Sequence, residues 1–96
     1  MFGLENKMKM DWEEGNPYIK AMILEVVENQ MRDNDPSETR KTFDRLSQEG
    51  HSDEDAKRLI GRLVASEIFD VLKKQEEFNP ERYVKALNNL PELPEE

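Results

Sequence analysis

Glu67 is the side chain whose position most suggests chemistry, because it falls on the apolar face of a helix predicted over residues 53–75. A helical wheel places it about 20° from Ile60, in the middle of that face. A carboxylate buried there has to be paired, hydrogen-bonded, protonated or bound to a metal ion. We expect a structural carboxylate that accepts hydrogen bonds from Tyr83, Arg82 or a group on the first helix; a metal ligand or general acid is the functional alternative.

His51 is the second candidate for chemistry, as the only histidine of the chain. It precedes three carboxylates, Asp53, Glu54 and Asp55, which point in different directions from a first helical turn and so do not converge on one metal ion. The chain has no cysteine, and no phosphate loop, His-Glu-x-x-His helix or Gly-x-Ser-x-Gly elbow occurs in it. We predict no enzyme activity, no cofactor and no metal, with Glu67 and His51 as weak candidates for a metal site.

The charge pattern disfavours two classes of partner. The 14 basic and 22 acidic residues give a net charge of −8, spread evenly along the chain, and an acidic surface repels nucleic-acid phosphates. Arg40, Lys41 and Arg45 interleave with acidic residues and predict a solvated helix face. No apolar run reaches the ~20 residues of a membrane span or the length of a signal peptide. We therefore expect a cytoplasmic, bacterial-type protein without nucleic-acid or membrane partners.

Four capping signals predict four helices. Asn or Asp before proline, and a serine hydroxyl, satisfy the free N–H groups of a first helical turn. These signals are Asn16-Pro17, Asp35-Pro36, Ser52 and Asn79-Pro80. Apolar spacing extends the helices to about Arg32, to just before Gly50, to about Gln75 and to Leu90. The predicted fold is an all-α, bundle-like single domain over residues 16–90 with a long central third helix, preceded by an extended arm (1–15) and followed by a mobile tail (91–96).

The arm and the third helix together suggest self-association. Met8, Met10 and Trp12 alternate with polar residues, a period of two that predicts an extended segment packed on its own domain or on a partner subunit. The apolar arc of the third helix is wide enough for burial on more than one side, while only 35% of the residues are hydrophobic. We expect a homodimer whose interface includes Trp12, Gly61, Ala65, Ile68, Phe69 and Leu72.

A string of residues over 16–90 resembles a family of short bacterial helical proteins of unknown function. The residues that carry the resemblance are Asn16-Pro17, Met22, Gln30, Asp33, Pro36, Arg40, Arg45-Leu46, Gly50, Ala56, Leu63, Glu67 and Tyr83. The family's first and third helices usually carry several histidines, a pattern that resembles a metal site completed by the carboxylate matching Glu67. This chain lacks those histidines and has Lys20 where the first would fall. The resemblance therefore implies a helical fold and supplies no function.

These observations favour a non-enzymatic protein-interaction or dimerisation module, with a further protein partner left open. Two alternatives remain. One is a carboxylate-metal enzyme or metal-binding protein centred on Glu67, and the other is an acidic regulator that binds a basic partner protein.

Overall fold

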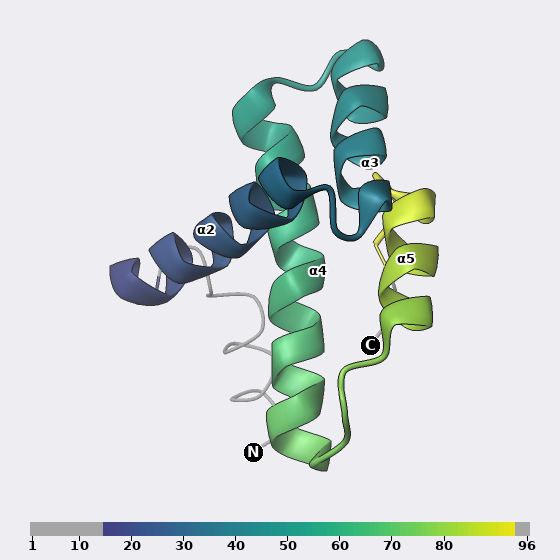
Figure 1. The fold of residues 1–96 in the computed structure, drawn as a ribbon. Helices are drawn as coiled ribbons and strands as arrows, with labels where there is room; N and C mark the ends of the chain where they lie inside the picture. Colours follow the sequence, from purple (N-terminus) through teal and green to yellow (C-terminus); the bar gives the residue numbers. More distant parts are fainter. Residues whose placement is uncertain (1–14, 94–96) are drawn as a thin grey trace.

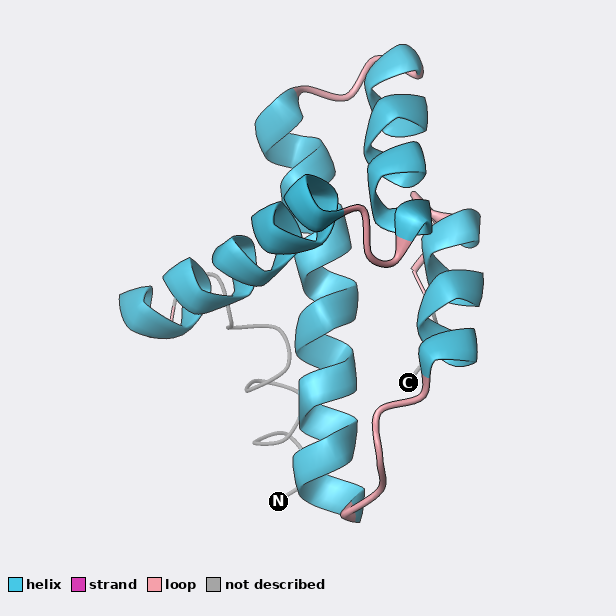
Figure 2. Cartoon of the chain, viewed as in Figure 1, coloured by secondary structure: helices cyan, strands magenta, loops and turns pink. Residues whose placement is uncertain are grey.

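The computed structural model describes residues 15–93. This part of the chain forms the helices α2 (Pro17–Asp33), α3 (Ser37–Gln48), α4 (Asp53–Lys74) and α5 (Pro80–Asn89) (Figure 1). Within the described residues there is no strand, and loops join the helices directly (Figure 2). The predicted all-α fold is thus confirmed, whereas residues 1–14 of the predicted arm and residues 94–96 of the predicted tail lie outside the described residues.

Side-chain caps start three of the helices as predicted. The side chain of Asn16 accepts a backbone N–H at 2.8 Å, that of Ser52 at 3.1 Å and that of Asn79 at 3.0 Å. The predicted cap at Asp35 is wrong, because α3 begins at Ser37 with Pro36 in the capping position and without a side-chain cap. Asp35 therefore stands one residue too early to reach the first turn.

Left-handed residues follow the described helices α2, α3 and α4. Gly50 has a φ of 101°, as expected for the residue that closes the second helix. Asn34 and Gln75 adopt the same left-handed region after α2 and α4, with φ of 57° and 55°. Asparagine tolerates this conformation better than most residues, while glutamine has no such advantage.

α4 is the central helix, since it packs against α2, α3 and α5 (Figure 1). Buried apolar side chains from all four described helices, together with Leu90 just after α5, form one core. Its members are Ile23, Val27, Leu46, Ala56, Ile60, Leu63, Val64, Ala65, Tyr83, Leu87 and Leu90. The C-terminal half of α2 crosses α4, and the N-terminal half projects away from the other helices (Figure 1).

Among the described residues, no helix combines the length and the apolar character that crossing a bilayer would require.

Candidate functional site

Glu67 is buried on α4, as the helical wheel predicts, with 7% of the residue exposed. Both carboxylate oxygens accept hydrogen bonds from Arg82 of α5: Nε donates to Oε2 at 2.8 Å and Nη2 donates to Oε1 at 2.9 Å. This bidentate geometry is the strongest form of a carboxylate–guanidinium pair. The hydrogen bonds from Arg82 to Glu67 hold the pKa of the guanidinium above its usual range. Arg82 is one of the partners that the sequence suggested for Glu67.

Arg82 also faces two further carboxylates. Its Nη2 lies 3.6 Å from Asp70 Oδ2, and its Nη1 lies 3.6 Å from Glu76 Oε1. The guanidinium therefore connects the C-terminal half of α4, the loop after it and the first turn of α5. We infer that the group positions α5, because one side chain contacts all three segments.

A second set of polar side chains links α2, α3 and α5 through hydrogen bonds. Gln30 Oε1 accepts hydrogen bonds from Thr39 Oγ1 at 2.7 Å and from the Tyr83 hydroxyl at 2.8 Å. Both donors are buried, with exposed fractions of 0% and 1%. Burial raises the pKa of Tyr83 to about 12, so this hydroxyl stays protonated and remains a donor at neutral pH.

Glu67, Gln30 and Tyr83 form part of the lining of a half-open groove of about 320 Å³. The exposed wall of this groove is almost entirely apolar. We call it the α4 groove. It is lined by residues of α2, α4, α5 and the loop between α4 and α5: Val26, Gln30, Val64, Glu67, Ile68, Val71, Leu72, Phe78 and Tyr83. Its three polar members are engaged with Arg82, Thr39 or each other. What the groove offers to an occupant is therefore apolar surface.

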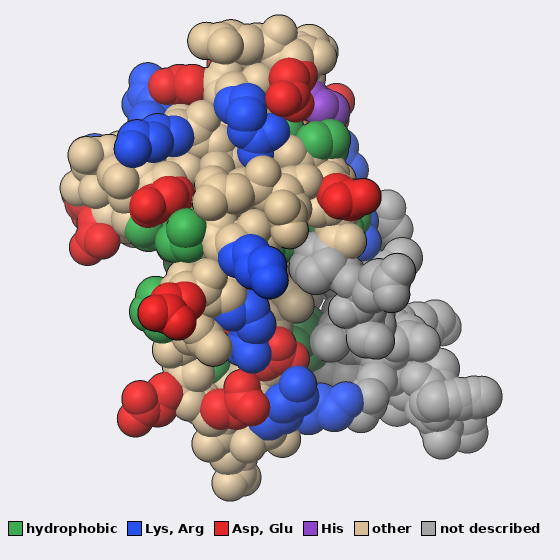
Figure 3. All heavy atoms as spheres, turned by 90° about the vertical axis from the view of Figure 1, so that its right-hand side faces the viewer, with side chains coloured by type: hydrophobic (Ala, Val, Ile, Leu, Met, Phe, Trp, Pro, Cys, Tyr) green, Lys and Arg blue, Asp and Glu red, His purple; other side chains and the backbone are tan. Residues whose placement is uncertain are grey.

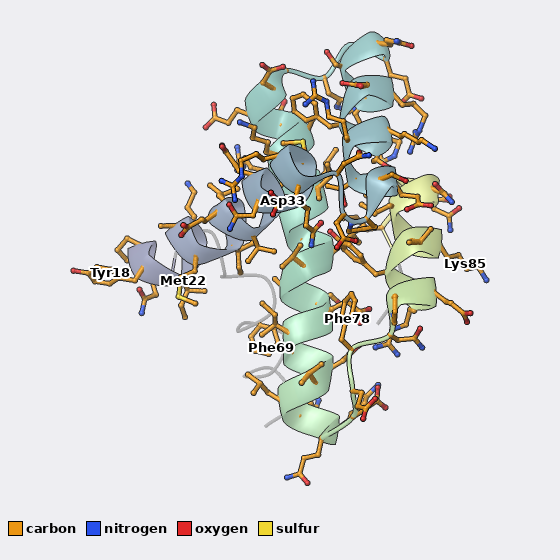
Figure 4. The ribbon with its side chains drawn as sticks, viewed as in Figure 1. Tyr18, Met22, Asp33, Phe69, Phe78 and Lys85 are labelled. Carbon is orange, nitrogen blue, oxygen red and sulfur yellow. The ribbon has the colours of Figure 1, made fainter. Side chains whose placement is uncertain are left out.

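Large apolar side chains are exposed in the wall of this groove and at the projecting end of α2. On α4 and the following loop, Ile68 is 42%, Leu72 71% and Phe78 49% exposed. At the projecting end of α2, Tyr18 is 80% and Met22 62% exposed, and Figure 4 shows both at the far end of that helix. Clustered apolar surface, as in each of these two places, marks contact sites more often than isolated exposed residues do.

Of the residues predicted to form the dimer interface, some are exposed, some are buried inside the single chain, and one lies outside the described residues. Ile68 and Leu72 are exposed on α4, and Phe69 is half-buried on the side of α4 away from Phe78 (Figure 4). Gly61 and Ala65 are buried within the chain's own core, so they are not available to a second copy. Trp12 lies outside the described residues. The homodimer itself stays a prediction.

The two weak metal candidates are not brought together. His51 is half-buried in the loop before α4, and the rise of a helix places Glu67 roughly 24 Å further along α4. Among the described residues, no three side chains of the His, Cys, Asp or Glu type gather as a metal site would require. A cation at Glu67 would also have to displace the guanidinium that occupies both carboxylate oxygens.

Arg45 has a role that the sequence did not indicate. We predicted a solvated face there, but Nη1 donates to the Leu90 carbonyl at 2.7 Å and Nη2 to the Leu87 carbonyl at 3.0 Å. Arg45 of α3 thus caps the C-terminal end of α5. No local pattern reveals this, since the donor and its acceptors lie more than forty residues apart.

Comparisons with protein-family models, with curated proteins and with solved structures found no match for this chain. The resemblance to a bacterial family of unknown function therefore stays a prediction.

Proposed function

We propose that the chain is a non-enzymatic protein-interaction module that forms a homodimer through the apolar surface of α2 and α4. The observation that carries the proposal is that one chain exposes two apolar surfaces: the groove with Ile68, Leu72 and Phe78 in its wall, and Tyr18 and Met22 at the projecting end of α2. Burying a large apolar side chain contributes about 1.5–3 kcal/mol. Several such side chains on each copy therefore favour association, against the entropy lost when two chains combine.

The chemistry of the groove supports binding over catalysis. The carboxylate of Glu67 is held by Arg82, and the hydroxyl of Tyr83 is engaged by Gln30 with a pKa of about 12. A general acid or base works best when its pKa is near the working pH. The Tyr83 hydroxyl does not meet that requirement, and Arg82 occupies both carboxylate oxygens of Glu67.

Sedimentation equilibrium of the full chain tests the proposal. We expect a dimer at micromolar concentration, weakened at least about tenfold by Met22→Glu or Leu72→Glu, because each would bury a charge in an apolar contact. Both positions are exposed, so the circular dichroism and the unfolding midpoint of each monomer should change little. Ala65→Glu would not serve this purpose, because Ala65 is buried in the core.

The matched control is Gln48→Glu. Gln48 is also exposed, but it ends α3 and belongs neither to the groove nor to the projecting end of α2. It adds the same charge to an exposed helix position and should leave the dimer intact. A wild type that stays monomeric at high concentration, or an equal loss with Gln48→Glu, would contradict the proposal.

A further inference from the structure

We propose that the projecting end of α2 in one copy enters the α4 groove of a second copy, and that the second copy does the same in return. This inference rests on the proposed homodimer and specifies which surfaces meet. We call the inserting surface the α2 tip, defined by Tyr18, Ile19 and Met22.

The α2 tip has the shape and composition of an inserting element. It projects from the other described helices (Figures 1 and 4), and its three apolar side chains are 80%, 45% and 62% exposed. Asn16 fixes its first turn, since its side chain accepts the N–H groups of Tyr18 at 2.8 Å and Ile19 at 3.4 Å. A tyrosine held on an ordered helix loses little conformational entropy on binding, as do the aromatic anchors of many interfaces.

The α4 groove has the complementary properties. Its volume of about 320 Å³ and its apolar wall suit an aromatic or aliphatic side chain. Its one carboxylate, Glu67, is paired with Arg82, so an apolar occupant would leave no buried charge without a partner. An inserting helix end and a groove that fits it are therefore present on one chain.

Reciprocal insertion agrees with the size and symmetry of a dimer. In a two-fold contact each copy supplies one tip and one groove, and the assembly closes at two subunits instead of forming a filament. The exposed parts of the three tip residues and of Ile68, Leu72 and Phe78 amount to something on the order of 600 Å², close to the ~800 Å² that each partner buries in a standard interface. The available apolar surface is thus of the right size.

Charge complementation between two full-length variants tests the contact. We expect Tyr18→Lys and Leu72→Glu to be monomeric when each is alone, at least about tenfold weaker than the wild type. Mixed together, they should form a dimer, because the lysine of one copy then faces the glutamate of the other while the second contact is unchanged. A mixture of Tyr18→Glu and Leu72→Glu is the matched control: it differs only in the sign of one charge and should not recover.

Disulfide cross-linking gives an independent readout, because the chain has no cysteine of its own. Under mild oxidation, a mixture of Tyr18→Cys and Leu72→Cys should yield a covalent dimer of the two variants, and a mixture of Gln48→Cys and Leu72→Cys should not, because Gln48 is exposed at the end of α3 and away from the groove. A wild-type dimer without complementation and without this cross-link would overturn the inserted-tip geometry and leave the proposed homodimer standing. A wild type that never dimerises would overturn both.

Discussion

At the scale of single residues, the buried carboxylate of Glu67 holds α5 against α4 through its pair with Arg82. Its place on the inner face of α4 follows from the period of the helix, which is why the sequence located it. The choice of Arg82 among several candidate partners depends on how α5 lies against α4, and no local pattern encodes that arrangement. The sequence therefore predicted that Glu67 needs a partner, and the structure shows which one it has.

Three substitutions of Glu67 separate its contributions to stability. Glu67→Ala should cost about 1–3 kcal/mol, because it removes two charge-assisted hydrogen bonds and leaves a void. Glu67→Gln keeps one acceptor and should cost less. Glu67→Leu should also lower the free energy of unfolding by less than Glu67→Ala does, because leucine fills the void. Arg82 would still have the carboxylates of Asp70 and Glu76 as partners.

Urea unfolding of each Glu67 variant measures these differences. Glu77→Ala is the control, because this glutamate is exposed in the loop between α4 and α5. If the three Glu67 variants were as stable as the wild type, the paired carboxylate would have no structural role.

At the scale of helices, capping chemistry was largely predictable and helix packing was not. Asn16, Ser52 and Asn79 cap their helices through contacts within three residues, a distance over which sequence and geometry are tightly linked. The capping of α5 by Arg45 spans two helices and follows only from the assembled fold. For the same reason the small residues Gly61 and Ala65, predicted to lie at an interface between copies, lie inside the single chain.

Removing the Arg45 cap should loosen α5. Arg45→Met keeps much of the apolar stem but removes the guanidinium donor from the carbonyls of Leu87 and Leu90, of which, among the described residues, only Leu87 keeps a backbone donor, the Leu90 N–H. We expect a loss of about 1–2 kcal/mol. Faster hydrogen exchange of the α5 amides, compared with those of α2, would show where the loss acts. Arg40→Met is the control on the same helix, since Arg40 is exposed and pairs with Asp44 one turn along α3. A uniform change across all helices would argue against a local cap.

At the scale of the whole molecule, charge and apolar surface act in opposite directions on self-association. Figure 3 shows acidic and basic side chains interspersed over one face of the chain, while the net charge is −8. Two copies therefore repel each other at long range, and the apolar contact has to overcome this repulsion. Composition alone indicated the net charge and the need to cover apolar surface, but only the fold shows where the groove and the α2 tip lie.

Salt should consequently strengthen the proposed dimer. Raising sodium chloride from about 20 mM to about 500 mM shortens the Debye length from roughly 20 Å to about 4 Å and screens the repulsion between the copies. We expect the dissociation constant measured by sedimentation to fall severalfold. A dimer that dissociates as salt is added would point to an interface held by ion pairs, contrary to the apolar contact proposed.

The oxygen of Gln30 has a consequence for how this chain can evolve. The backbones of the described helices α2 and α5 do not contact each other, yet this one atom accepts from hydroxyls on α3 and α5. A change at Gln30 would remove the shared acceptor of two buried hydroxyls at once, whereas a change at Thr39 or Tyr83 removes one donor. In any set of homologous sequences, positions 30, 39 and 83 should therefore covary, and replacements at position 30 should accompany loss of both hydroxyls.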